Sequence, residues 1–257
     1  MEAANGNKWL EVWTRKGREA EAGGLASLMR ADGFDAGTGS MTEDDWLRQA
    51  ERIAVRLDLA RARNVLEVGC GAGAMLWPLR DLPLACYGVD YSETLVDVAC
   101  RAMPDITVQT AEAAALPFPD ATFEAVFSHG VFFYFPDLDY AARALAEITR
   151  VLIPGKGRAL ILDLPDMALR DACERFRREV AYGGKDYPTE QEGPYRHTYY
   201  PRSFFTNFAA GRGMQAEFFD QDIASYPMSP YRYNVLLRFD HCRVSGCTEG
   251  ASHAAGD

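Results

Sequence analysis

The chain has 257 residues, of which 48% are hydrophobic and 25% are charged, and its formal net charge is −10. These values fit one α/β domain with insertions, and the acidic balance disfavours a nucleic-acid partner because it repels phosphate backbones. No apolar run is long enough to span a bilayer and the first residues lack the pattern of a secretory signal, so we expect a cytoplasmic protein with no membrane partner.

The first part of the chain is expected to be helical. One helix is predicted from Trp9 to Ala31, and a glycine-rich stretch follows over residues 33–39. Ser40 and Glu43 then form the S-x-x-E pattern of a capping box, which predicts the start of another amphipathic helix. We expect residues 1–62 to form an N-terminal helical lid segment.

From Asn64 onward, short apolar runs alternate with helical patterns. The apolar runs are residues 65–68, 85–89, 106–108, 123–127 and 159–162, and helices are predicted near 74–80, 92–103 and 138–152. This alternation indicates parallel strands joined by crossover helices, which build a doubly wound, mostly parallel sheet.

The last third of the chain is predicted to cover and complete this sheet. A helix is expected over 168–181, a polar and aromatic connection over 182–200, a helix over 201–208, and strands over 215–220 and 233–239. We therefore expect one α/β domain over residues 63–242, with a substrate-covering insertion at about 165–212. The small, polar residues 243–257 are expected to be a disordered tail.

A glycine-rich turn after the first predicted strand is the strongest chemical signal. The sequence Val-Leu-Glu-Val-Gly-Cys-Gly-Ala-Gly places Gly69, Gly71 and Gly73 between a buried strand and a helix. Glycine allows positive φ and a close approach of backbone to a ligand. The acidic Glu67 inside the strand would repel a phosphate and attract a cation or an amino group. The pattern therefore favours a sulfonium amino-acid cofactor over a dinucleotide.

Two further acidic residues follow later predicted strands. Asp90 ends the second strand at the offset where a ribose-binding carboxylate is expected, and Ser92 is placed to cap the next helix. Glu112 follows the third strand, where its side chain could face an adenine edge; the alternative is an exposed loop glutamate.

These segments resemble the class I (Rossmann-like) S-adenosylmethionine-dependent methyltransferase superfamily, in its small-molecule branch. The matching segments are LEVGCGAG, GVDYS, EAAALPFPDATFEAV and RVLIPGKGRALILD, which together cover about Asn64 to Asp163. The resemblance implies a seven-stranded sheet whose last strand is antiparallel, with S-adenosylmethionine as cofactor and S-adenosylhomocysteine as product. The cofactor-binding residues it implies are Glu67, Gly69, Cys70, Gly71, Gly73, Asp90, Tyr91, Glu112, Ala113 and Ser128. The sequence departs from many relatives at Gly155-Lys156-Gly157, a surface turn, and at Glu112, where aspartate is commoner.

Two histidines are candidates for a general base that would take a proton from an acceptor. His129 follows the predicted fourth strand, where donor and acceptor would meet, and His197 lies in the aromatic connection after the fifth strand. A neutral imidazole can accept a proton near pH 7. Each histidine could instead donate or accept hydrogen bonds without taking a proton.

Aromatic residues near these histidines are expected to shape the acceptor pocket. Trp9 and Trp13 share a helix face, so they are candidates for a lid over the sulfonium through cation–π attraction, or for hydrophobic anchoring of their helix. The other expected pocket residues are Phe133, Tyr134, Tyr195, Tyr199 and Tyr200.

We therefore expect methyl transfer to a small-molecule acceptor, foremost an oxygen atom of a secondary metabolite. The alternatives are a nitrogen or carbon acceptor, and a protein that binds the same cofactor without transferring methyl, in an isomerase-like or binding role. The six cysteines are scattered without zinc-like spacing, so we expect free thiols and no metal. A monomer or a homodimer is expected.

Overall fold

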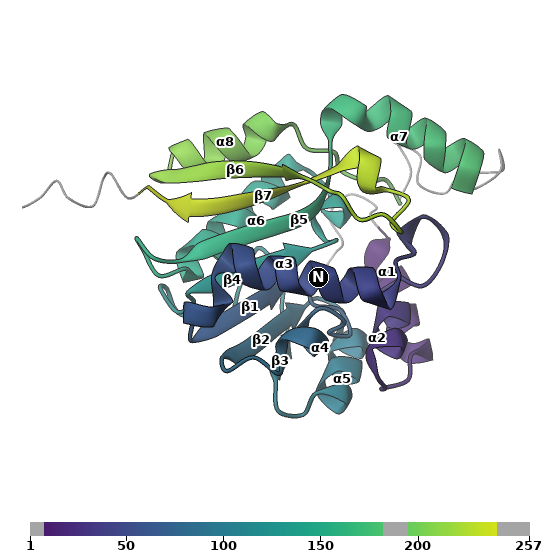
Figure 1. Cartoon of the computed structure of the whole chain (residues 1–257), viewed down its shortest axis with the longest axis horizontal. Helices are drawn as coiled ribbons and strands as arrows, with labels where there is room; N and C mark the ends of the chain where they lie inside the picture. The colour runs from purple at the N-terminus through teal and green to yellow at the C-terminus, as the bar shows by residue number, and fades with distance from the viewer. Residues whose placement is uncertain (1–7, 182–194, 241–257) are drawn as a thin grey trace, which may run out of the picture.

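The computed structural model describes residues 8–181 and 195–240 and centres on one seven-stranded sheet (Figure 1). The strand order is β3-β2-β1-β4-β5-β7-β6; β7 is antiparallel to both of its neighbours, and the other neighbouring pairs are parallel. The strands are β1 (Asn64–Val68), β2 (Ala85–Asp90), β3 (Thr107–Thr110), β4 (Ala125–His129), β5 (Arg158–Pro165), β6 (Met214–Asp220) and β7 (Arg232–Phe239). The predicted doubly wound sheet with an antiparallel last strand is confirmed.

Helices cover both faces of this sheet. The helices are α1 (Trp9–Glu19), α2 (Leu25–Ala31), α3 (Glu43–Leu57), α4 (Leu76–Leu79), α5 (Glu93–Ala102), α6 (Leu138–Val151), α7 (Arg170–Phe176) and α8 (Arg202–Ala210). One hydrophobic core joins the sheet to α2, α3, α4 and α5, and a second joins its other face to α6 and α8. Because both faces are buried, the parallel strands read as continuous apolar runs rather than alternating ones.

The N-terminal segment differs from its predicted form. The helix predicted from Trp9 to Ala31 is two helices, α1 and α2, separated by a break that contains Gly23 and Gly24. The cap of α3 is Thr42 rather than Ser40, since the Thr42 hydroxyl accepts a hydrogen bond from the Asp45 amide at 3.2 Å.

The first helix is fastened to the helix that follows the second strand. α1 crosses α5 at Gly17, where an added Cβ would lie 2.3 Å from the hydroxyl of Thr94. That hydroxyl donates a hydrogen bond to the Thr14 carbonyl at 2.9 Å. The absence of a side chain at Gly17 therefore allows α1 to lie close to the start of α5.

Other boundaries shift by a few residues. The fourth strand begins at Ala125, because Phe123 forms an isolated parallel bridge with Leu152 instead. The helix predicted over 168–181 is a 3-10 turn, then α7, then a π turn over Arg177–Ala181. Of the predicted connection, residues 182–194 lie outside the described part of the chain, as does the predicted tail 243–257.

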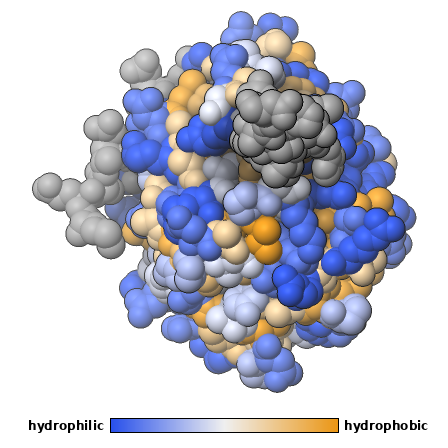
Figure 2. All heavy atoms as spheres, turned by 90° about the vertical axis from the view of Figure 1, so that its left-hand side faces the viewer, coloured by the Kyte–Doolittle hydropathy of each residue, from blue (hydrophilic) through white to orange (hydrophobic). Residues whose placement is uncertain are grey.

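The carboxyl ends of the parallel strands lie on the right in Figure 1, beside α1, α2 and α7. Figure 2 shows the left-hand side of the molecule in Figure 1, away from these strand ends, and this side carries small hydrophobic patches separated by hydrophilic residues. The described part of the chain contains no helix that is long and apolar enough to cross a membrane.

Candidate functional site

The glycine turn connects the end of β1 to α4 through backbone that favours glycine. Gly69, Gly71 and Gly73 have φ values of 79°, 53° and 86°. At Gly71 an added Cβ would also lie 2.2 Å from a carboxylate oxygen of Asp32. The turn therefore requires glycine both for its conformation and for the close approach of a carboxylate.

Two predicted carboxylates face this turn from neighbouring strands. Glu67 on β1 is 3% exposed, and its Oε2 has no hydrogen-bond partner among the described residues. Asp90 ends β2; its Oδ2 accepts the Gly71 amide at 2.9 Å and its Oδ1 accepts the Ser92 amide at 2.8 Å. Ser92 stands at the start of α5, but its hydroxyl contacts Thr94 rather than capping the helix backbone.

A third carboxylate, which the sequence did not indicate, binds the turn directly. Asp32 follows α2, and its two oxygens accept the amides of Ala72 at 2.6 Å and Ala74 at 3.1 Å. The helical pattern of the N-terminal segment gives no sign of this contact, because it joins residues 40 positions apart in the chain.

The pKa values of these three acids are raised, mainly because burial disfavours their charged forms. Burial raises the pKa of Asp32 to about 7 and that of Asp90 to about 6, against their hydrogen bonds to backbone amides. Burial also raises the pKa of Glu67 well above its ordinary value, with further contributions from Asp32 and Asp90. Lys16 lowers the pKa of Asp32, though less than burial raises it. A bound cation would stabilise the charged forms of these acids.

The remaining predicted cofactor residues surround the same strand ends. Cys70 is buried beside Gly88, where an added Cβ would lie 2.8 Å from its sulfur. The Tyr91 hydroxyl and the Ser128 hydroxyl are buried and lack hydrogen-bond partners within the described ranges.

Glu112 and Ala113 come after β3, in a more open place. Glu112 is exposed and accepts a hydrogen bond from the Tyr140 hydroxyl, whereas Ala113 is half-buried. Ala113 packs against the core face that holds α6. The strand that they follow, β3, pairs with β2, which ends in Asp90.

His129 ends β4 and is 5% exposed. Its ring stacks on Phe34 with centroids 5.4 Å apart and meets the edge of Trp46 at 5.2 Å. Burial lowers the pKa of His129, while Asp163 acts in the opposite direction, so the imidazole is neutral near pH 7. Its Nε2 has no hydrogen-bond partner among residues 8–181 and 195–240.

His197 lies in an aromatic cluster that brings together segments far apart in the sequence. Its ring contacts Phe133 at 4.8 Å, Trp9 at 5.4 Å and Tyr134 at 5.7 Å between centroids. Its Nδ1 contacts the guanidinium of Arg177. Burial, followed by Arg177 and then Arg232, lowers the pKa of His197 well below its ordinary value. An imidazole between cations is a poorer base than His129.

Both predicted lid tryptophans belong to this cluster. Trp9 contacts Tyr134 at 4.6 Å and Tyr195 at 5.5 Å, and its indole N–H donates to the Arg196 carbonyl at 3.2 Å. Trp13 contacts Tyr134 at 5.3 Å. The structure thus brings α1 against the segment that carries His197.

The two remaining predicted pocket tyrosines face opposite sides of the sheet. Tyr199 is buried in the core that contains α3, and its hydroxyl donates to Glu174. Tyr200 is a correction: it lies in the core with α6 and α8, fully buried, and its hydroxyl donates to the Phe132 carbonyl at 2.7 Å. Adjacent residues of an extended segment point to opposite faces, so Tyr200 belongs to the core rather than to the pocket.

A second buried polar cluster lies beside His129 and was not predicted. Asp163 sits in a bulge of β5 with φ of 62°, an unusual value for a residue other than glycine. The Tyr226 hydroxyl donates to its Oδ2 at 2.8 Å, and the Nε of Arg232 lies 3.6 Å from its Oδ1. Asp163 directly follows the fifth predicted apolar run, 159–162, but its partners Tyr226 and Arg232 come from the last part of the chain.

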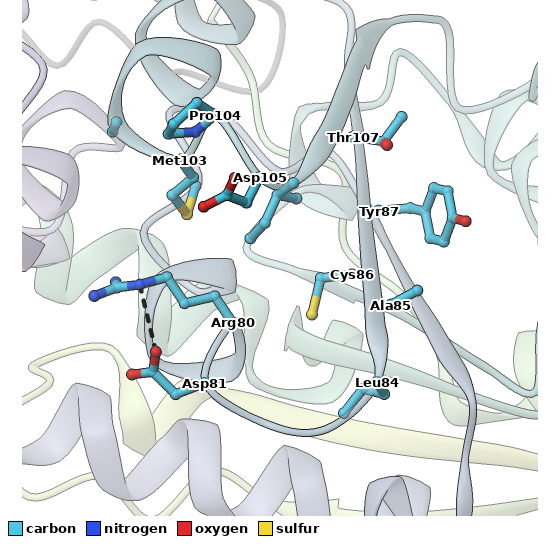
Figure 3. A pocket seen from close by; sticks show the side chains of 12 residues that line it. Arg80, Asp81, Leu84, Ala85, Cys86, Tyr87, Met103, Pro104, Asp105 and Thr107 are labelled. Atoms are coloured by element: carbon cyan, nitrogen blue, oxygen red, sulfur yellow. Dashed lines mark ion pairs between the residues drawn. The ribbon is translucent and has the colours of Figure 1, made fainter.

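Two cavities among the described residues lie away from this edge. The larger, about 310 Å³, opens at the start of β2, where the Arg80–Asp81 ion pair and the Cys86 side chain line it (Figure 3). The smaller, about 110 Å³, lies between α3 and the β5–β7 region. At the glycine turn itself, the Asp32 carboxylate already contacts the backbone. No group of three or more His, Cys, Asp or Glu in the described ranges is placed to hold a metal ion.

Part of the chain is similar in sequence to known methyltransferases. Residues 66–161 match a family model described as a methyltransferase domain. The methyltransferase GfsG of Streptomyces halstedii is 32% identical over 124 residues, which are 46% of this chain and 43% of that protein. The O-methyltransferase cnsE of Penicillium expansum is 35% identical over 126 residues, 46% of this chain and 44% of that protein. The matched segments thus span less than half of these relatives.

Solved structures extend the likeness of the fold over more of the chain. Magnesium protoporphyrin IX methyltransferase from Synechocystis PCC 6803, solved with bound SAM, superposes with a TM-score of 0.54 at 13% identity, covering 77% of this chain and 81% of that one. At this identity the likeness is one of fold.

Proposed function

Because the chain belongs to the class I S-adenosylmethionine-dependent methyltransferase superfamily, we propose that it transfers a methyl group from S-adenosylmethionine to an oxygen atom of a small molecule. The carboxyl ends of β1, β2 and β4 bring the glycine turn, Asp90 and His129 to one edge of the sheet, which is where open α/β sheets bind ligands.

One observation carries the choice of cofactor: three carboxyl groups surround the glycine turn. Asp32 and Asp90 bind its amides, and Glu67 keeps a buried oxygen without a partner within the described residues. A phosphate placed here would add negative charge to a site that already raises the pKa of each of these acids. An ammonium or sulfonium would instead be stabilised, as the amino-acid part of the proposed cofactor requires.

The residues fit this cofactor part by part. Glu67 would accept a hydrogen bond from the amino group, and the free lone pairs of Asp90 would accept hydrogen bonds from the ribose hydroxyls. The Tyr91 and Glu112 side chains would border the base. When bound, the cofactor supplies a methyl group that is already activated on sulfur.

His129 supplies the base in this proposal. Its buried, neutral imidazole carries an Nε2 that hydrogen-bonds to no described residue, so it can accept the proton of an acceptor hydroxyl. The nearby Asp163 carboxylate stabilises the imidazolium that results, because it acts to raise the pKa of His129. Amine or carbon acceptors would use the same cofactor half but depend less on this proton transfer.

The N-terminal residues 1–62 act as the lid in this proposal. Support comes from the contacts of Trp9 with Tyr195 and His197, and from the stacking of Phe34 on His129. These three contacts support the proposal because they join N-terminal side chains to His129, at the end of β4, and to the segment that carries His197.

A calorimetric titration tests the cofactor assignment. S-Adenosylhomocysteine, which carries the amino group, and adenosine, which lacks it, are titrated into wild type and Glu67→Gln. We expect Glu67→Gln to weaken binding of S-adenosylhomocysteine about 10–100-fold, which corresponds to the loss of one hydrogen bond to a charged group. Binding of adenosine should be unchanged. Glu124→Gln, a buried glutamate paired with Arg63 and Lys156, is the matched control.

Equal effects on both ligands, or no binding of either to wild type, would contradict the assignment. An acceptor screen that follows S-adenosylhomocysteine release, with the mass of the product, then distinguishes oxygen from nitrogen and carbon acceptors. A protein that binds the cofactor but releases no homocysteine nucleoside with any acceptor would fit the non-transferring alternative.

A further inference from the structure

Arg232, the first residue of β7, is buried, and two of its hydrogen-bond donors have no partner among the described residues. Its side chain is 2% exposed. Its Nε and Nη1 make no hydrogen bond to any residue in 8–181 or 195–240, and its nearest carboxylate oxygen, Oδ1 of Asp163, is 3.6 Å away. Leaving a buried guanidinium this poorly hydrogen-bonded is costly, because the group has lost its water without a full replacement.

The neighbouring groups do not satisfy these donors. Asp163 is engaged by the Tyr226 hydroxyl, and its backbone amide is held by Asn234. Glu174, the carboxylate on α7, accepts its hydrogen bond from Tyr199 instead. The positive field reaches His197, whose pKa Arg177 and Arg232 both lower. Asp163 Oδ1 also has no hydrogen-bond partner among the described residues; it balances the charge of the guanidinium from 3.6 Å, whereas Nη1 is left without an acceptor there.

The position of the guanidinium relates it to the proposed reaction. It lies over the ring of Phe133 at 4.7 Å from the centroid, and Phe133 belongs to the short helix that follows His129. Its carboxylate neighbour Asp163 also influences His129. Arg232 and His129 therefore share one neighbouring carboxylate, that of Asp163.

We propose, resting on the function proposed above, that the methyl acceptor is a small aromatic carboxylic acid whose carboxylate pairs with Arg232. The planar guanidinium offers a fork that matches a carboxylate with two hydrogen bonds, and such charge-assisted bonds are among the strongest in proteins. The ring of the acid packs against Phe133, and its hydroxyl lies toward Nε2 of His129. Arg232 is a specificity-determining residue in this arrangement, and it takes no proton.

Binding of two matched probes tests this proposal in the wild-type protein. Benzoate and benzamide have nearly the same shape, but one carries a carboxylate and the other is neutral. Each is titrated into the protein saturated with S-adenosylhomocysteine. We expect benzoate to bind at least tenfold more tightly than benzamide. Equal binding of the two, or no binding of benzoate, would overturn the proposal without any variant being made.

Two arginine variants on the same strand locate the effect. Arg232→Gln is expected to weaken benzoate binding at least tenfold while leaving benzamide unchanged. Arg238→Gln, which removes an exposed arginine paired with Glu217, is expected to change neither. Unchanged benzoate binding in Arg232→Gln would overturn the proposal. Failure of the wild type to bind S-adenosylhomocysteine would overturn the proposed function as well, whereas binding of that nucleoside without preference for benzoate would overturn this inference alone.

Discussion

The carboxyl group of Asp32 allows a quantitative test of the electrostatics at the glycine turn. Burial raises its pKa from 3.8 to about 7, although it accepts hydrogen bonds from Ala72 and Ala74. A carboxyl whose pKa is higher in the folded state binds its proton more tightly there than in the unfolded chain. Its contribution to stability is therefore fully present below pH 3.8 and is lost as the pH rises through 7.

The size of the effect follows from these two pKa values. Between pH 5 and pH 8, the linkage relation gives a loss of about 2.5 kcal/mol in the free energy of unfolding from this one group. Burial lowers the pKa of His129 and of His197, which makes their contributions run in the opposite direction below pH 6.5. The pH dependence of the wild-type free energy of unfolding alone therefore cannot isolate the contribution of Asp32.

Subtracting the free energy of unfolding of a variant that lacks Asp32 cancels the contributions of the other titrating groups. Urea unfolding of wild type and Asp32→Asn is measured at pH 5, 6, 7 and 8, and the free energies of unfolding are subtracted at each pH. We expect the wild-type value to fall relative to the variant by about 2.5 kcal/mol from pH 5 to pH 8, while lost hydrogen bonds add an offset that does not vary with pH. Asp35→Asn, which removes a more exposed carboxyl near Arg30, is the control. Parallel profiles for wild type and Asp32→Asn would refute the reasoning.

Four further substitutions separate the roles of individual side chains. Asp90→Ala should weaken S-adenosylhomocysteine binding about 100-fold in calorimetry, because it removes acceptors for both ribose hydroxyls, and unchanged affinity would refute the ribose assignment. His129→Gln should lower turnover about 100-fold or more with nucleoside affinity nearly unchanged, whereas His197→Gln should have the smaller effect; wild-type turnover in both would mean that no general base is used. Tyr200→Phe should cost about 1–3 kcal/mol in the free energy of unfolding, since it leaves the buried carbonyl of Phe132 without its donor, and should leave the affinity for the nucleoside intact.

Local sequence was enough to predict which residues surround the glycine turn on the first two strands. The glycine turn, Glu67 and Asp90 lie within two adjacent strand–turn–helix units, so their spacing in the chain determines their spacing in space. The order of apolar runs likewise predicted the parallel part of the sheet. The capping error at α3 arose because Ser40–Glu43 and Thr42–Asp45 both fit the pattern of a capping residue followed by an acid three positions later, and the Ser40 hydroxyl is instead bonded to Gly37.

The acceptor side could be predicted less well, because its contacts join distant segments. Asp32 contacts the glycine turn from the N-terminal segment, and Arg232 contacts Asp163 from the last strand. Neither residue stands in a motif. The error at Tyr200 has a related cause: a run of tyrosines shows that aromatic rings are present, but not which ones face the core.

The crossing of α1 over α5 at Gly17 gives the molecule a mechanical link. α5 starts just after Asp90, and its Thr94 is hydrogen-bonded to Thr14 of α1. The same helix α1 carries Trp9, whose ring contacts that of His197. A nucleoside that shifts the first turn of α5 would carry that tryptophan with it. Binding of the nucleoside would then change the affinity for the acceptor, and by thermodynamic reciprocity binding of an acceptor would change the affinity for the nucleoside by the same factor.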